Sequence, residues 1–196
     1  SAGAAAALVG SGAVPAAEAT TRHGTVEVDV VRSEETTVIR GLATVGVLDR
    51  PFVGTRAILD PSDIVGGVVS RSSPAEIGLS GIAGGLVTHR PDDPGGVGFR
   101  LSRDGESGAT APATRVKAIT VPGNLSTVDV AEHRVLDDGE DYAFEVDRGV
   151  ISVDGERELE VRDGTVRLRP VSDGPRLVDV ESVLERAADE GRFRLG

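Results

Sequence analysis

Apolar and polar residues alternate along several short segments of this chain, the pattern of strands that bury one face. Residues 25–30 show it most clearly, with valines at 26, 28 and 30. Similar β-branched runs predict further strands at 36–43, 52–59, 64–70, 115–121, 142–146, 150–153, 158–162 and 165–171. Glycine or Asp-Gly separates many of these runs, which predicts a mainly β domain, a β-sandwich or layered antiparallel sheet.

Helical periodicity is confined to two places. After Asp179, apolar residues recur at 180, 183, 184, 187 and 188, so we expect a helix that Asp179 caps and Gly191 ends. This helix should cover a face or an edge of the sheet. A shorter helix is predicted to start at Ser73-Pro74, with a glycine-rich run closing it.

The first 24 residues differ in composition from the rest, because they are rich in alanine, glycine and serine. They have no basic leader and no continuous apolar run of about 18 residues, so neither a signal peptide nor a membrane span fits. The chain also has no methionine, even at position 1. We interpret 1–24 as a remnant helix and linker from a missing N-terminal α/β domain, and 25–196 as the β-rich C-terminal domain.

The charge balance is acidic, with 32 Asp and Glu against 21 Lys and Arg and a net charge of -11. This surplus disfavours nucleic acid and anionic membranes as partners. A single lysine and few aromatic residues indicate a halophilic protein. The chain has no cysteine, which excludes disulfides and thiol nucleophiles and favours a cytoplasmic location. Its three histidines are widely separated, so no metal ligands are predicted.

Residues 76–85 form a glycine-rich run in which backbone N–H groups could approach a phosphate closely. The candidate ligand-binding residues in it are Ser80, Gly81, Gly84 and Gly85. Close helix packing or a helix C-cap explains the same glycines equally well. The run matches neither the Gly-Lys-Ser/Thr phosphate loop nor the dinucleotide-binding fingerprint.

The triplet Asp-Gly-Glu occurs three times, and two of the three copies are expected to be ordinary turns. The copy at 154–156 lies between two strand-like runs, at the tip of a tight hairpin, where Glu156 would be held in place. Arg56, inside the apolar run 52–61, is a candidate phosphate clamp, although a surface ion pair is the commoner role of such an arginine.

Taken together, the segments 52–61, 77–85, 153–158 and 174–180 resemble the C-terminal half of the acetoin-catabolism protein X family, from about Thr25 to the end. That family is placed in the ATP-NAD kinase-like group of the NAD kinase and diacylglycerol kinase superfamily. The N-terminal α/β domain of this superfamily carries a Gly-Gly-Asp-Gly motif. This chain has no such motif, as expected if that domain is missing.

The resemblance implies a nucleotide-dependent phosphotransferase of ATP-NAD kinase type, which phosphorylates NAD or another hydroxylated small molecule. It implies ATP or another nucleotide, NAD and Mg²⁺ as cofactors, with Asp154 and Glu156 as catalytic acids. Glu156 would orient or deprotonate the acceptor hydroxyl, and Mg²⁺ would offset the phosphate charge. The alternative is a non-catalytic small-ligand-binding or regulatory domain on the same fold. Assembly into a homo-oligomer is left open.

Overall fold

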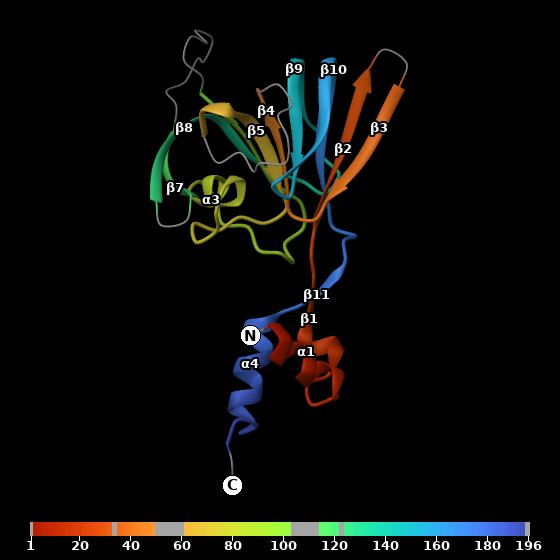
Figure 1. Cartoon of the computed structure of the whole chain (residues 1–196), viewed down its shortest axis with the longest axis vertical. Helices are drawn as coiled ribbons and strands as arrows, with labels where there is room; N and C mark the ends of the chain where they lie inside the picture. Colours follow the sequence, from red (N-terminus) through yellow and green to blue (C-terminus); the bar gives the residue numbers. More distant parts are fainter. Residues whose placement is uncertain (1, 33–34, 50–60, 103–113, 122–123, 195–196) are drawn as a thin grey trace.

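The computed structural model describes residues 2–32, 35–49, 61–102, 114–121 and 124–194, and it is mainly β, as the sequence predicts (Figure 1). Nine strands form one antiparallel sheet in the order β3-β2-β10-β9-β4-β5-β6-β8-β7. Their bounds are β2 Thr25–Arg32, β3 Glu35–Gly41, β4 Thr44–Leu48, β5 Ile64–Val69, β6 Gly96–Leu101, β7 Thr114–Val121, β8 Asn124–Leu136, β9 Tyr142–Val153 and β10 Glu156–Val171.

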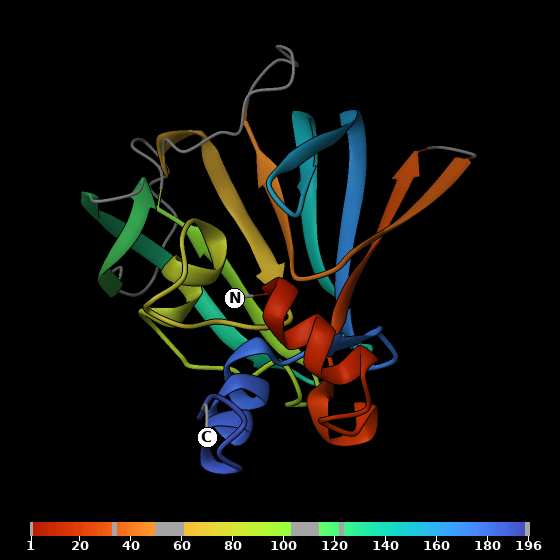
Figure 2. The ribbon, with the colours of Figure 1, turned by 60° about the horizontal axis from the view of Figure 1, so that its bottom comes forward.

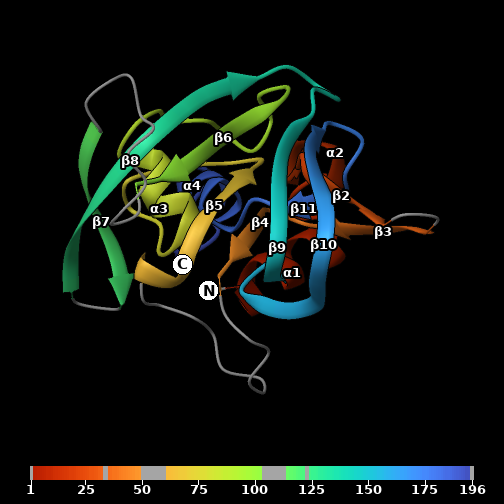
Figure 3. The same cartoon turned by 90° about the horizontal axis from the view of Figure 1, so that it is seen from above.

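The sheet is strongly curved, as Figure 3 shows from above. β2 contacts β4 and β5, and β10 contacts β5, although β2 and β10 are not hydrogen-bonded to these strands, so the two halves of the sheet face one another. Glycines make room inside the curve. A Cβ added to Gly66 would lie 2.9 Å from the ring of Phe144, and one added to Gly98 would lie 3.0 Å from the ring of Tyr142. The arrangement is consistent with the expected β-sandwich-like fold.

Each face of the sheet carries its own hydrophobic core, because neighbouring residues of a strand point to opposite faces. Val68 and Ile151 belong to the core inside the curve, and the adjacent Val69 and Val150 belong to the core on the other face. The second core is covered by the short helix α3, Leu79–Gly84. A Cβ added to Gly46 of β4 would lie 2.8 Å from the Leu79 side chain, so glycine lets α3 lie close to the sheet.

The predicted strands are mostly present, with changes at their ends. The runs 142–146 and 150–153 join into β9, and 158–162 and 165–171 join into β10, because the intervening residues keep their partners across the hairpin. The sequence analysis missed β4, β6 and β8. Glycine weakens the strand signal in β4 and β6, and a run of exposed polar side chains hides it in β8. The strand expected at 52–59 lies outside the described residues.

The prediction that a helix starts at Ser73-Pro74 is wrong. Residues 73–78 form a turn in which the Glu76 N–H donates to the Ser73 carbonyl over 3.0 Å. Gly78 then adopts a φ of 71°, outside the helical region, and the helix starts only after it. The glycine-rich run therefore forms α3 itself instead of ending an earlier helix.

The C-terminal helix α4, Val180–Asp189, has the predicted cap, because Asp179 accepts a hydrogen bond from the Ser182 N–H over 3.1 Å. Gly191 follows its end with a φ of 74°. Its packing differs from the prediction. The helix lies mainly against α1, Ala2–Gly10, and α2, Ala16–Ala19, below the sheet (Figures 1 and 2). The apolar stripe of α4 meets the alanines of α1 and α2 instead of the sheet.

This helical unit is joined to the sheet by a second, two-stranded ladder of β1, Thr20–Arg22, with β11, Arg176–Val178. The buried residues of the unit are Ala5, Val14, Ala19 and Val183. Residues before and after the sheet in sequence therefore pack together. The domain boundary expected after residue 24 stays a prediction. Among the described helices, none has the length and apolar character needed to cross a membrane.

Candidate functional site

The hairpin tip between β9 and β10 and the segment from Arg71 to Ser80 border one groove of about 370 Å³. This volume lies within the range of small-ligand sites, roughly 300–1,000 Å³. The lining residues are Leu42, Ala43, Thr44, Leu48, Ile64, Arg71, Glu76, Ile77, Gly78, Leu79, Ser80, Ser152, Asp154 and Gly155. The fold thus brings together the two motifs that the sequence analysis selected, at Ser80 and at Asp154.

Asp154 holds the groove wall in place through its carboxylate. The wall is the turn between β3 and β4, and Asp154 accepts hydrogen bonds from its Leu42, Ala43 and Thr44 N–H groups over 2.6, 2.7 and 2.9 Å. Its own N–H donates to the Thr44 carbonyl over 2.8 Å. Asp154 and Gly155 both have positive φ, as the two-residue hairpin turn requires. This network gives Asp154 a positioning role. A catalytic role for it stays a prediction.

Glu156 lies beside the groove but on the other face of the hairpin. It pairs with Val153 across the turn, and directly opposed residues point to the same face. Val153 belongs to the core inside the curve, whereas the adjacent Ser152 lines the groove. Glu156 is exposed, and no hydrogen bond or ion pair joins its side chain to another described residue. Its predicted catalytic role stays a prediction.

Ser80 is buried and closes the segment that carries Arg71. Its hydroxyl donates to the Arg71 carbonyl over 3.1 Å, and its own carbonyl accepts from the Ser73 N–H over 3.3 Å. Two residues before Ser80, the Gly78 N–H donates to the Ile119 carbonyl of β7 over 2.9 Å. The backbone of Arg71 is therefore fixed relative to both α3 and the sheet.

The remaining glycines of the run lie against protein atoms. A Cβ added to Gly81 would lie 2.4 Å from the Glu76 carbonyl oxygen, and one added to Gly84 would lie 2.1 Å from the backbone of Ser73. Gly85 is the C-cap of α3, and a Cβ there would lie 3.2 Å from Val116. These contacts support the packing and C-cap explanation. Ligand binding by Gly81, Gly84 and Gly85 stays a prediction, and Arg56 lies outside the described residues.

The described residues around the groove do not fit a divalent cation. Mg²⁺ prefers carboxylate oxygens and water, but both carboxylate oxygens of Asp154 are already directed at backbone N–H groups, which leaves Glu76 as the other carboxylate of the lining. Elsewhere in the described parts of the chain, no three His, Asp or Glu side chains gather into a metal-binding cluster. The expectation of Mg²⁺ therefore rests on the family resemblance alone.

Arg71 supplies positive charge at one end of the groove. Its Nε atom is buried and has no hydrogen-bond partner among the described residues. The charge of Arg71 also acts on His23. Burial and, second, the Arg71 guanidinium lower the pKa of His23, whereas Asp179 and Asp92 raise it. The electrostatic influence of Arg71 thus extends from the groove to the junction between β1 and β2.

The sequence analysis missed Arg71 and the Leu42–Thr44 turn. The available signal for Arg71 was an arginine that directly follows the strand predicted at 64–70. The turn carried no signal, since its contribution to the groove depends on Asp154, which lies more than a hundred residues away in sequence.

Comparison with known proteins gives two matches. The family model described as the acetoin catabolism protein X C-terminal domain matches residues 25–173. Acetoin catabolism protein X of Cupriavidus necator is 30% identical over 154 residues, which is 78% of this chain and 41% of that relative. The chain thus spans about two fifths of the length of the curated relative that it matches. The matched segment includes the whole groove.

Proposed function

Since the chain belongs to the acetoin catabolism protein X C-terminal domain family, we propose that it binds a small ligand of nucleotide type, with a ring system and a charged group. The groove between Asp154 and Ser80 carries this proposal. Six of its lining residues are apolar and suit a ring: Leu42, Ala43, Leu48, Ile64, Ile77 and Leu79. Small-ligand sites are typically such apolar concavities with a few polar groups that fix orientation.

Direct binding tests this function. Titration calorimetry of the 196-residue chain with ATP, ADP and NAD should show one saturable site for at least one of these ligands. Ala43→Leu adds three carbons inside the groove, so it should weaken that binding by about tenfold or more, the equivalent of about 1.4 kcal/mol.

Ala143→Leu is the matched control, because Ala143 is an exposed residue of β9 that does not line the groove. It should leave the affinity unchanged. Equal affinities for the two variants would place the ligand elsewhere, and no binding of any of the three ligands would contradict the proposal.

The second candidate is phosphotransfer by the longer protein, with Glu156 as the acid or base. It is favoured by the exposure of Glu156 at a fixed hairpin tip, directly beside the groove-lining Gly155. The placement of the acetoin-catabolism protein X family in the ATP-NAD kinase-like group supports it and implies ATP or another nucleotide as donor and NAD or another hydroxylated molecule as acceptor. The location of the Glu156 side chain across the hairpin from the groove makes binding the function that the geometry supports better.

Glu156→Gln distinguishes the two functions. It removes the charge and the base at nearly constant size, so phosphotransfer by the longer protein should fall by roughly 10²-fold, while ligand binding stays unchanged. Glu140→Gln alters another Asp-Gly-Glu copy, whose Glu140 N–H donates to Asp137 in an ordinary turn, and should leave turnover within a factor of about two. Similar turnover in both variants would contradict a catalytic role for Glu156.

A further inference from the structure

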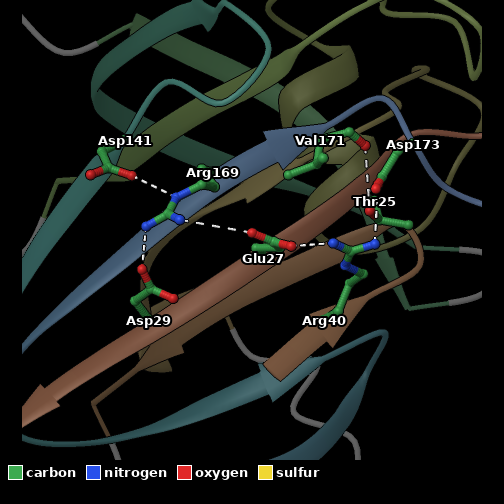
Figure 4. Close-up of polar contacts among 8 residues, drawn as sticks. All are labelled: Thr25, Glu27, Asp29, Arg40, Asp141, Arg169, Val171 and Asp173. Carbon is green, nitrogen blue, oxygen red and sulfur yellow. Dashed lines mark hydrogen bonds and ion pairs between the residues drawn. The ribbon is translucent and has the colours of Figure 1, made fainter. Parts of the chain in front are cut away.

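Arg71 differs from those arginines of the sheet that are paired with carboxylates. Figure 4 shows two of them on the outer face of β10, β2 and β3. Arg169 pairs with Asp29, with Asp141 at 2.8 Å and with Glu27 at 3.8 Å. Arg40 pairs with Glu27 and, at 3.0 Å, with Asp173. In an acidic chain this is the expected condition of an arginine.

Arg71 is partly buried, and none of the described carboxylates forms an ion pair with it. Two carboxylates share its groove. Asp154 is occupied by three backbone N–H groups, and Glu76 lies on the same segment without reaching the guanidinium. Because the buried Nε–H is a donor without an acceptor, the site carries an unmet desolvation cost. An anion bound by the guanidinium in the groove would offset a charge that no described carboxylate offsets.

We propose that Arg71 is the anchor for the anionic group of the groove ligand, and that this group is a phosphate or a carboxylate. The guanidinium fork matches both groups by paired hydrogen bonds. The fixed backbone supports the assignment, since the Ser80 hydroxyl holds the Arg71 carbonyl from the first turn of α3. Ser80 then acts as a positioning residue, without touching the ligand. This inference rests on the proposed function, because the anchor and the apolar wall belong to one groove.

The first test compares two ligands that differ by one phosphate group. The chain should bind AMP about tenfold or more tightly than adenosine, and Arg71→Gln should bring the two affinities together. Arg71→Lys keeps the charge but loses the fork, so it should recover part of the preference. Glu76→Gln removes an acid from the groove and should strengthen AMP binding by a few fold. Arg90→Gln changes an exposed arginine outside the groove lining and should alter nothing.

The second test identifies the anion and uses His23 as an independent readout. An anion on Arg71 offsets the charge that helps lower the His23 pKa, so this pKa should rise when inorganic phosphate or acetate binds. Arg71→Gln should raise it without any ligand and abolish the response to both anions. The histidine ring signals in NMR titrations report these shifts. A larger response to phosphate than to acetate at equal concentration assigns the phosphate class, and the reverse assigns the carboxylate class.

The outcomes separate the two proposals. If adenosine and AMP bind with equal affinity and Ala43→Leu weakens both, the groove function stands and the Arg71 assignment is overturned. If phosphate shifts His23 through Arg71 but no nucleoside or nucleotide binds, the anchor stands and the nucleotide proposal is overturned. If AMP keeps its preference over adenosine in Arg71→Gln, the anchor is a different residue and the inference is wrong.

Discussion

At the scale of single residues, the carboxylate of Asp154 connects the hairpin tip to the Leu42–Thr44 turn and so shapes the groove. Asp154→Asn keeps the side-chain shape but replaces one accepting oxygen with an NH₂ group that would face backbone N–H donors. We expect a loss of about 1–3 kcal/mol in the free energy of unfolding, the usual cost of breaking hydrogen bonds to a charged group. Urea unfolding measures it.

Asp163→Asn is the matched control, because Asp163 also has a positive φ, 47° against 49° for Asp154, and its side chain has no hydrogen bond or ion pair with the described residues. Asparagine tolerates this backbone conformation as well as aspartate does, so the control should change stability by less than about 0.5 kcal/mol. Equal losses in the two variants would show that the backbone conformation, and not the hydrogen bonds to the turn, determines the effect.

The sequence predicts that Asp154 lies in a hairpin turn, but it does not predict the hydrogen bonds that its carboxylate accepts. A hairpin turn is a local feature, and one Asp-Gly pair between two strand-like runs suffices to predict it. The function of the carboxylate depends on a turn that is distant in sequence. The sequence likewise cannot show that no described carboxylate pairs with Arg71, since that depends on which acids the fold brings near.

At the scale of elements, the cap of α4 offers a test with a defined pH dependence. Hydrogen bonds from the Ser182 N–H and hydroxyl lower the pKa of Asp179. A carboxyl group whose pKa is lower in the folded state stabilises that state above its unfolded pKa, and the contribution is lost as the pH falls through the folded value. Asp179→Ala should therefore destabilise α4 by about 1 kcal/mol at pH 7.

The difference between Asp179→Ala and the parent should shrink as the pH falls below the ordinary value of 3.8. Hydrogen exchange of the α4 amides measures it directly, even if the helical unit opens without the sheet. Asp189→Ala removes an acid from the last residue of the same helix, where negative charge is unfavourable, and should be neutral or slightly stabilising. A pH-independent effect of Asp179→Ala would show that the cap acts without its charge.

The elements also show what limits prediction from this sequence. The start of α4 was predicted because the cap and the apolar period lie within a dozen residues. The start of α3 was placed too early because Ser73-Pro74 carries a good helix signal locally, whereas the contact of Gly84 with Ser73 requires a turn there. Tertiary packing, and not local helix propensity, therefore determines where α3 starts.

At the scale of the whole molecule, the mainly antiparallel β class follows from many short alternating runs. The strand order does not, because β10 pairs with β2 and β9 pairs with β4 across long stretches of sequence. Nor could the sequence show that α4 packs against α1 and not against the sheet, since the apolar stripe of α4 could pack against either. Periodicity indicates that a face is buried without indicating against what.

The helical unit below the sheet has a consequence for the order of events in synthesis. Its two halves stand before and after the sheet in the chain, and the Asp179 N–H donates to the Ala19 carbonyl where they meet. At the pace of translation, the ribosome needs on the order of ten seconds or more to make the strands between them. Throughout that interval α1 has no α4 to cover it. Consecutive strands such as β2 and β3 can pair as they emerge, whereas β2 must wait for β10 and β4 must wait for β9. The helical unit closes after them, because α4 follows β10 in the chain.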